Sequence, residues 1–131
     1  MDQVPLVNEW KEGGKKFLEE FNNTFPVKTA FCAKDSEESP WYLYVASDKI
    51  DADNISAAYT EVLRTAKRLP VSVHFDPFRV KILRMDEPIT RAVLDIQDRH
   101  PGPFATVYSG SQLGTVNIEG AYIYPSPLVT Q

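Results

Sequence analysis

Cysteine and histidine are scarce in this sequence of 131 residues, which contains one cysteine and two histidines. Cys32 therefore has no partner for an intrachain disulfide, and a reducing cytosol is the compartment that fits this usage. A transition-metal site normally needs three or four protein ligands. Because His74, His100 and Cys32 are far apart in the sequence, we expect neither a bound metal nor another cofactor.

Long apolar runs and an excess of basic residues are also missing. No stretch approaches the roughly 20 residues of a membrane span, and the first residues, MDQVPLVNEWKEGG, lack the features of a signal peptide. The 14 basic and 18 acidic residues give a formal charge of −4. This balance argues against a dedicated nucleic-acid-binding protein. The charge is uneven, however: residues 1–63 carry a net charge of −6 (6 − 12) and residues 64–100 a net charge of +3 (8 − 5).

What remains is the composition of an ordinary globular protein, with 43% hydrophobic and 24% charged residues. A chain of this length is the usual size of one domain and can bury a core without metal or disulfide links. No repeat, linker or low-complexity segment interrupts it. We therefore expect residues 1–131 to form a single cytoplasmic domain.

Hydrophobic residues recur at helical spacing in three segments. We expect helices from Pro5 to about Asn22, from a cap at Asp53 or Asn54 to Leu69, and from Asp86 to His100. In the first helix, Gly13 and Gly14 indicate a kink or a close approach to another backbone. The buried stripe of the second helix is expected to comprise Ile55, Ala58, Tyr59, Val62, Leu63, Ala66 and Leu69.

Alternating and β-branched segments predict five strands. They are Val27–Lys34, Trp41–Ser47, Phe78–Leu83, Phe104–Ser109 and Thr115–Tyr124, the last interrupted at Gly120. The order α-β-β-α-β-α-β-β predicts an α+β fold, with a mixed, mostly antiparallel sheet of about five strands and three helices on one face. The helix between the second and third strands is typical of a crossover between parallel strands.

His74-Phe75-Asp76 is the first candidate for chemistry. A histidine and an aspartate two residues apart on an extended chain point to the same side, so they could bind a metal or act as a base with its orienting group. Asp76-Pro77 also has a structural use, because aspartate often opens a turn and proline fixes its φ angle. We favour the turn, with a site as the alternative.

Other catalytic patterns are weak. Cys32 lies within a strand, where a cysteine behaves as a small hydrophobic residue, and no G-x-S-x-G elbow is present. The segment GSQLG, Gly110–Gly114, lacks the features of a phosphate-binding loop and predicts a hairpin turn. Glu9-Trp10-Lys11 matches a nuclease E-x-K element but falls on a helix. We therefore assign no catalytic residue.

Tyrosine and tryptophan are concentrated on the expected strands. These residues are Trp41, Tyr42, Tyr44, Tyr108, Tyr122 and Tyr124. Tyr122 and Tyr124 share one face of the last strand. If helices leave one sheet face open, these rings would line it, and an exposed aromatic face is typical of an interface. The alternative is that the rings fill the core and the sheet edges.

Four segments together carry a resemblance that covers most of the chain: WYLYVASD, AAYTEVLRTAKRLP, DPFRVKIL and GTVNIEGAYIYP. With them the chain resembles short bacterial proteins of unassigned function. The resemblance implies a small bacterial cytosolic protein and carries over no activity.

Our main functional hypothesis is a non-enzymatic interaction or binding module that forms a homodimer through an aromatic sheet face containing Tyr122, Tyr124, Trp41 and Tyr44. The alternative is a small enzyme or ligand-binding protein. Its pocket would lie near His74, Asp76, Arg79 and Glu119. A third hypothesis, disfavoured by the net charge, is nucleic-acid binding through Arg64, Lys67, Arg68, Arg79, Lys81 and Arg84.

Overall fold

The computed structural model describes residues 8–34, 36, 38–73, 75–99, 106–113 and 116–125. The helices are α1 (Asn8–Phe21), α2 (Ile55–Arg68) and α3 (Pro88–Arg99), with a 3-10 turn, η1 (Pro77–Arg79). The strands are β1 (Thr29–Lys34), β2 (Tyr42–Ala46), β3 (Val80–Leu83), β4 (Thr106–Leu113) and β5 (Val116–Ile123). None of the helices in these residues is long and apolar enough to cross a membrane.

The strands form one sheet in the order β3-β2-β1-β5-β4. Neighbouring strands pair antiparallel except β2 and β3, which are parallel and joined through α2. The predicted α+β class, with three helices and a mixed, mostly antiparallel sheet, is confirmed. The predicted crossover between parallel strands is confirmed as well.

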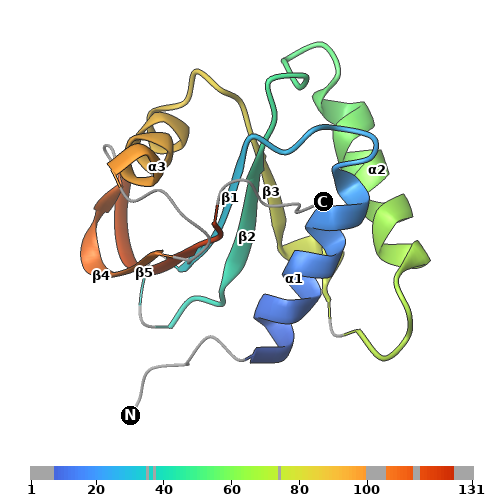
Figure 1. Cartoon of the computed structure of the whole chain (residues 1–131), viewed down its shortest axis with the longest axis horizontal. Coiled ribbons are helices and arrows are strands. Elements are labelled where there is room, and N and C mark those ends of the chain that lie inside the picture. Colours follow the sequence, from blue (N-terminus) through green and yellow to red (C-terminus); the bar gives the residue numbers. More distant parts are fainter. Residues whose placement is uncertain are drawn as a thin grey trace.

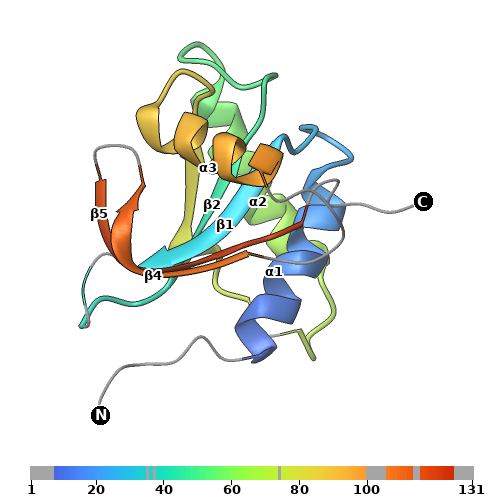
Figure 2. The same cartoon turned by 60° about the vertical axis from the view of Figure 1, so that its left-hand side comes forward.

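The helices cover both faces of the sheet, which corrects the expectation that they lie on one face (Figures 1 and 2). Helices α1 and α2 pack on one face, where Phe17, Phe21 and Val62 meet Cys32 and Leu43. Helix α3 packs on the other face through Ile89, Val93 and Ile96. Two layers are needed because β1 is central and all six of its residues are buried, so both of its faces need cover.

Helix α1 approaches the sheet closely at one of its two glycines. An ideal Cβ atom on Gly14 would lie 2.5 Å from the Tyr124 hydroxyl oxygen. Two atoms at that distance overlap, so any side chain at position 14 would force Tyr124 to move. The glycine therefore accommodates a tyrosine side chain, whereas the sequence suggested a kink or an approach to another backbone.

Several element boundaries differ from the predictions. Gly110 to Leu113 continue β4, so the predicted turn at these residues is wrong, and Gly114 lies outside the described residues. The predicted interruption of the last strand at Gly120 is wrong, because β5 continues through it and keeps one register with β4 from Ser109↔Gly120 through Ser111↔Ile118. The third strand begins at Val80, since the preceding residues form η1. The predicted ends at Pro5, His100 and Phe104 lie outside the described residues.

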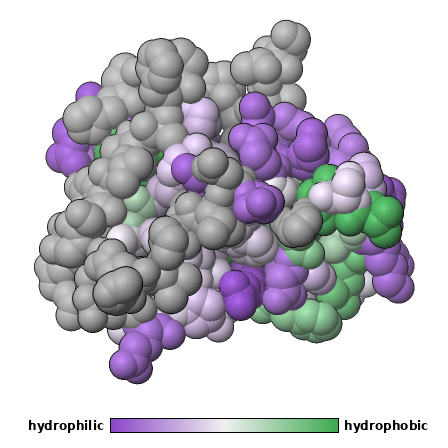
Figure 3. Space-filling model, turned by 90° about the horizontal axis from the view of Figure 1, so that it is seen from below, coloured by the Kyte–Doolittle hydropathy of each residue, from purple (hydrophilic) through white to green (hydrophobic). Residues whose placement is uncertain are grey.

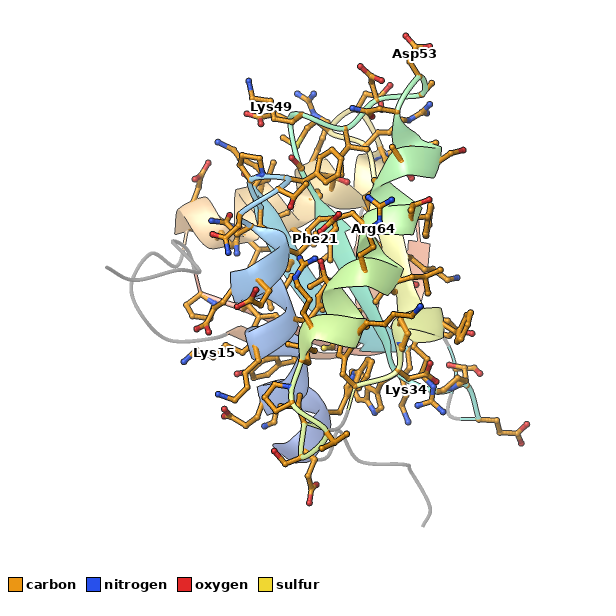
Figure 4. All side chains as sticks on the ribbon, turned by 90° about the vertical axis from the view of Figure 1, so that its right-hand side faces the viewer. Lys15, Phe21, Lys34, Lys49, Asp53 and Arg64 are labelled. Carbon is orange, nitrogen blue, oxygen red and sulfur yellow. The ribbon has the colours of Figure 1, made fainter. Side chains whose placement is uncertain are left out.

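A polar cluster joins α1 to α2 on the sheet face that these two helices cover. The buried Glu61 carboxylate accepts hydrogen bonds from Thr24 Oγ1 (3.3 Å), Thr65 Oγ1 (3.1 Å) and Arg68 Nη2 (3.0 Å). Arg68 also lies 4.0 Å from Glu20 at the end of α1. Figure 4 shows the two helices side by side in front of the sheet, with Phe21 on α1 and Arg64 on α2.

Candidate functional site

Asp76 works as a turn residue, as the sequence analysis favoured. Its side chain accepts a hydrogen bond from the Phe78 backbone N–H (2.9 Å) and so caps η1, with Pro77 at the first position. Its other carboxylate oxygen lies 3.7 Å from Arg79 Nε. His74 lies outside the described residues. Asp76 and Arg79 thus bind each other and the local backbone.

The sheet order separates the residues of the predicted pocket. Arg79 directly precedes β3, at one edge, whereas Glu119 lies on β5, three strands away. At roughly 4.8 Å per strand, their backbones are about 14 Å apart. The structure therefore does not bring Asp76, Arg79 and Glu119 together, and it describes only the backbone of Glu119.

Tyr124 lies in the core, only 3% exposed, which corrects the expectation that its ring lines an open sheet face. Its hydroxyl donates to the Lys11 carbonyl oxygen (3.0 Å) and lies 3.6 Å from Cys32 Sγ. Tyr122 shares this face and meets the Tyr124 ring edge-on at 5.1 Å, as expected from their spacing. Tyr122 is half-buried beneath Lys11, whose Nζ lies 4.9 Å from the ring centroid.

The groups of this buried cluster stay protonated near neutral pH. Burial raises the pKa of the Cys32 thiol to about 12, although the contact with the Tyr124 hydroxyl and the charge of Lys11 act in the opposite direction. Burial also raises the pKa of Tyr124, and the neighbouring thiol raises it further. Because the thiolate is the reactive form of cysteine, Cys32 is not activated as a nucleophile.

Trp41 and Tyr44 lie on opposite faces of the sheet. Trp41 packs at the rim of the α1–α2 side, with Lys34 Nζ 5.7 Å from its ring centroid. Tyr44 stacks on Phe31 with a centroid distance of 4.8 Å. Both side chains are half-buried, so they do not join Tyr122 and Tyr124 in a single aromatic surface.

A different set of hydrophobic side chains is exposed, on α2 and on the segment that follows it. Val71 is 104% exposed, Phe78 81%, Leu63 42% and Tyr59 41%. We call these four residues the α2–η1 surface. Figure 3 shows the molecule from below: hydrophobic residues gather at its right-hand side, where α2 and the following segment lie in Figure 1. Exposed apolar side chains that gather on one part of the surface are typical of interaction sites.

Sequence reasoning placed Tyr59 and Leu63 in the buried stripe of α2, and that placement is wrong. The buried stripe of α2 is narrower and contains Ala58, Glu61, Val62 and Thr65, with Glu61 on the side of the helix that meets the end of α1. The sequence contained a signal for this exposed surface, because α2 has more apolar positions than one packed face of a helix can bury.

The basic residues of this region differ in their surroundings. Arg68 pairs with Glu61, Arg79 with Asp76, and Arg84 with Asp86. Arg64 and Lys67 are exposed on α2. Lys81 projects to the other face of the sheet, where its Nζ lies 4.6 Å from the Tyr42 ring centroid. The six residues of the nucleic-acid hypothesis therefore do not form one continuous basic surface.

Comparison of the chain with family models, curated proteins and solved structures finds no match. Within the described residues, no group of three or more histidine, cysteine, aspartate or glutamate side chains is arranged to hold a metal ion. We therefore take the α2–η1 surface as the candidate site, because its hydrophobic side chains are exposed to solvent.

Proposed function

We propose that this chain is a non-enzymatic protein-interaction module and that it binds its partner through the α2–η1 surface. The exposure of Phe78, at 81%, is the observation that carries the proposal. An aromatic ring held in water by a capped turn is available to a partner without rearrangement of the core. The free thiol of Cys32 fits a reducing compartment, so we place this function in the cytoplasm.

The physical argument is one of desolvation. Transferring a fully exposed valine or phenylalanine side chain into a protein contact contributes about 2 kcal/mol. Val71 and Phe78 are both close to that limit of exposure. Phe78 is also held in place, because Asp76 fixes η1 beneath it. Preorganisation of this kind reduces the entropy that is lost on binding.

The homodimer remains a separate prediction. Its expected contact was the pair Tyr122 and Tyr124, but burial of Tyr124 leaves that pair unable to form an open interface. The alternative of a small enzyme or ligand-binding pocket has little support, since Asp76 and Arg79 bind each other and Glu119 lies three strands away.

Site-specific photo-crosslinking in cells tests the proposal. A photoreactive phenylalanine analogue replaces Phe78 in one variant and Glu19, an exposed residue of α1, in a control variant. We expect protein adducts from position 78 that are absent from position 19 and that disappear when Leu63→Ser is added. Equal adducts from both positions, or none from position 78, would contradict the proposal.

A further inference from the structure

The α2–η1 surface has a defined order along its length. Tyr59, Leu63 and Lys67 are spaced by four residues, so they form one row along α2. The Tyr59 hydroxyl accepts a hydrogen bond from the Ile82 backbone N–H (3.0 Å), which fixes the start of this row beside β3. The row therefore runs along the edge of the sheet.

The directions of α2 and β3 decide which residues of β3 and η1 lie beside this row. Helix α2 joins the parallel strands β2 and β3, so it runs antiparallel to β3. Four residues of α2 rise about 6 Å along the helix axis, and two residues of β3 cover about 6.6 Å. Leu63 is thus about level with Val80, and the following turn of α2, which contains Lys67, lies toward η1. Contacts between α2 and η1 agree with this alignment.

The edge of β3 is unsuited to strand addition by a partner. The Ile82 N–H already bonds to Tyr59, and β3 has only four residues. A partner therefore meets side chains here and not an open row of backbone groups. Side chains in a row on a helix are the usual contact for an amphipathic helix, which presents its own apolar groups at similar spacing.

The exposed charges on this stretch of α2 are positive, and the one carboxylate beside Phe78, that of Asp76, is paired with Arg79. Arg64 and Lys67 are exposed on the same part of α2, whose single acidic residue, Glu61, is buried and bonded to Arg68. The whole chain, in contrast, carries a formal charge of −4. A complementary partner therefore has acidic residues beside its apolar ones. A second copy fits less well, because a two-fold contact would bring the basic residues of both copies together.

We infer that the α2–η1 surface binds an acidic amphipathic helix of another protein. The apolar side of that helix covers Leu63 and Phe78, and its carboxylates face Arg64 and Lys67. This inference rests on the proposed function and adds the chemical class of the partner.

A displayed library of random peptides tests the partner class. Peptides that bind the L63S/F78S variant are first removed from the library. The remaining peptides are then selected for binding to the wild-type chain. We expect the enriched sequences to carry a net negative charge, with apolar residues at helical spacing. Enrichment of basic or neutral sequences would overturn the inference. It would also be overturned if every peptide that binds the wild-type chain binds the L63S/F78S variant as well, or if no peptide binds.

Two charge-reversed double variants then test the positive groups with a synthetic enriched peptide, by fluorescence anisotropy. R64E/K67E removes the proposed contacts, and K15E/K49E changes the net charge equally at exposed residues away from the row (Figure 4). We expect the first to weaken binding about tenfold or more and the second by less than about threefold. Equal effects would show that only net charge matters, which contradicts the inference.

Two other outcomes identify other occupants. Salt-sensitive binding of a single-stranded DNA oligonucleotide, lost in R64E/K67E, would replace the helix with a nucleic acid. A concentration-dependent dimer that L63S/F78S abolishes would replace it with a second copy. If crosslinks form at position 78 but no acidic peptide binds, the interaction module stands and the partner class is wrong.

Discussion

At the scale of single residues, Gly14 on α1 leaves no room for a side chain beside Tyr124, which directly follows β5. A Cβ atom at position 14 would lie 2.5 Å from the Tyr124 hydroxyl but 3.5 Å from Cζ of the ring. The hydroxyl alone therefore excludes a larger residue, since 3.5 Å is an ordinary contact distance. The two positions should be coupled energetically.

We predict that Gly14→Ala lowers the free energy of unfolding by about 1–2 kcal/mol through overpacking. Tyr124→Phe removes the hydroxyl and its bond to Lys11, which costs about 1 kcal/mol. Adding Gly14→Ala to Tyr124→Phe should then stabilise the protein by up to about 1 kcal/mol, because alanine is the better helix former. Urea denaturation of the four proteins measures the coupling. Additive effects would show that the contact is not tight.

The Cys32 thiol gives a second prediction at this scale. It is 0% exposed, and burial raises its pKa to about 12. We expect a thiol-reactive dye at about pH 8 to label the native protein slowly and the urea-unfolded protein rapidly. The labelling rate should rise with urea concentration in parallel with unfolding, because the dye reaches the thiol only after the protein opens. Fast labelling in native buffer would indicate an accessible thiol.

At the scale of elements, η1 depends on one side chain. Asp76 accepts the Phe78 N–H and so satisfies a donor that the turn leaves free. We predict that Asp76→Ala costs about 1 kcal/mol, whereas Asp76→Asn, which can still cap, costs less than half of that. Thermal unfolding measures both. Equal losses would mean that the charge contact with Arg79, and not the cap, holds this turn.

Glu61 links two helices, and its charge state makes the link depend on pH. Burial raises its pKa, but hydrogen bonds from Arg68, Thr65 and Thr24 and the charge of Arg68 outweigh burial, so the pKa is lowered below 4.5. A lowered pKa stabilises the folded state above about pH 4.5, and this contribution is lost as the pH falls through the folded-state pKa.

We predict that Glu61→Gln lowers the free energy of unfolding at about pH 7 by about 1–2 kcal/mol. The difference from wild type should shrink as the pH falls below about 4.5 and Glu61 becomes protonated in the folded state. Glu19→Gln, on the exposed side of α1, is the control and should have little effect. Urea denaturation across this pH range checks the prediction. A difference that is independent of pH would exclude the carboxylate charge as the cause.

At the scale of the whole molecule, replacing exposed and buried hydrophobic residues by serine should change the free energy of unfolding by different amounts. We predict that L63S/F78S lowers the free energy of unfolding by no more than about 1.5 kcal/mol, because Phe78 faces water and Leu63 is only partly covered. Y122S/Y124S should cost roughly 3 kcal/mol or more, because Tyr124 fills the core. Urea denaturation and light scattering of both variants test this. A folded Y122S/Y124S protein with altered self-association would restore these tyrosines as an interface.

The sequence by itself determined the elements and the class of fold. Helical spacing gave the three helices, alternation gave the strands of the sheet, and Asp76-Pro77 gave the turn that η1 forms. These features depend on residues close in the chain, whose periodicity and turn chemistry act locally. The length of β4 escaped this reasoning, because Gly110 and Gly114 suggest a turn while cross-strand pairing extends the strand through Leu113.

The tertiary structure alone decided which apolar residues are buried. Tyr124 and Leu63 both lie among apolar residues in the sequence, yet one is 3% exposed and the other 42%. Helical period identifies the apolar side of α2 but not the width that the sheet covers, and strand alternation does not tell which helix covers a face. Because burial depends on how separate elements meet, it is the arrangement of α2, η1 and β3 that leaves the residues of the candidate site exposed.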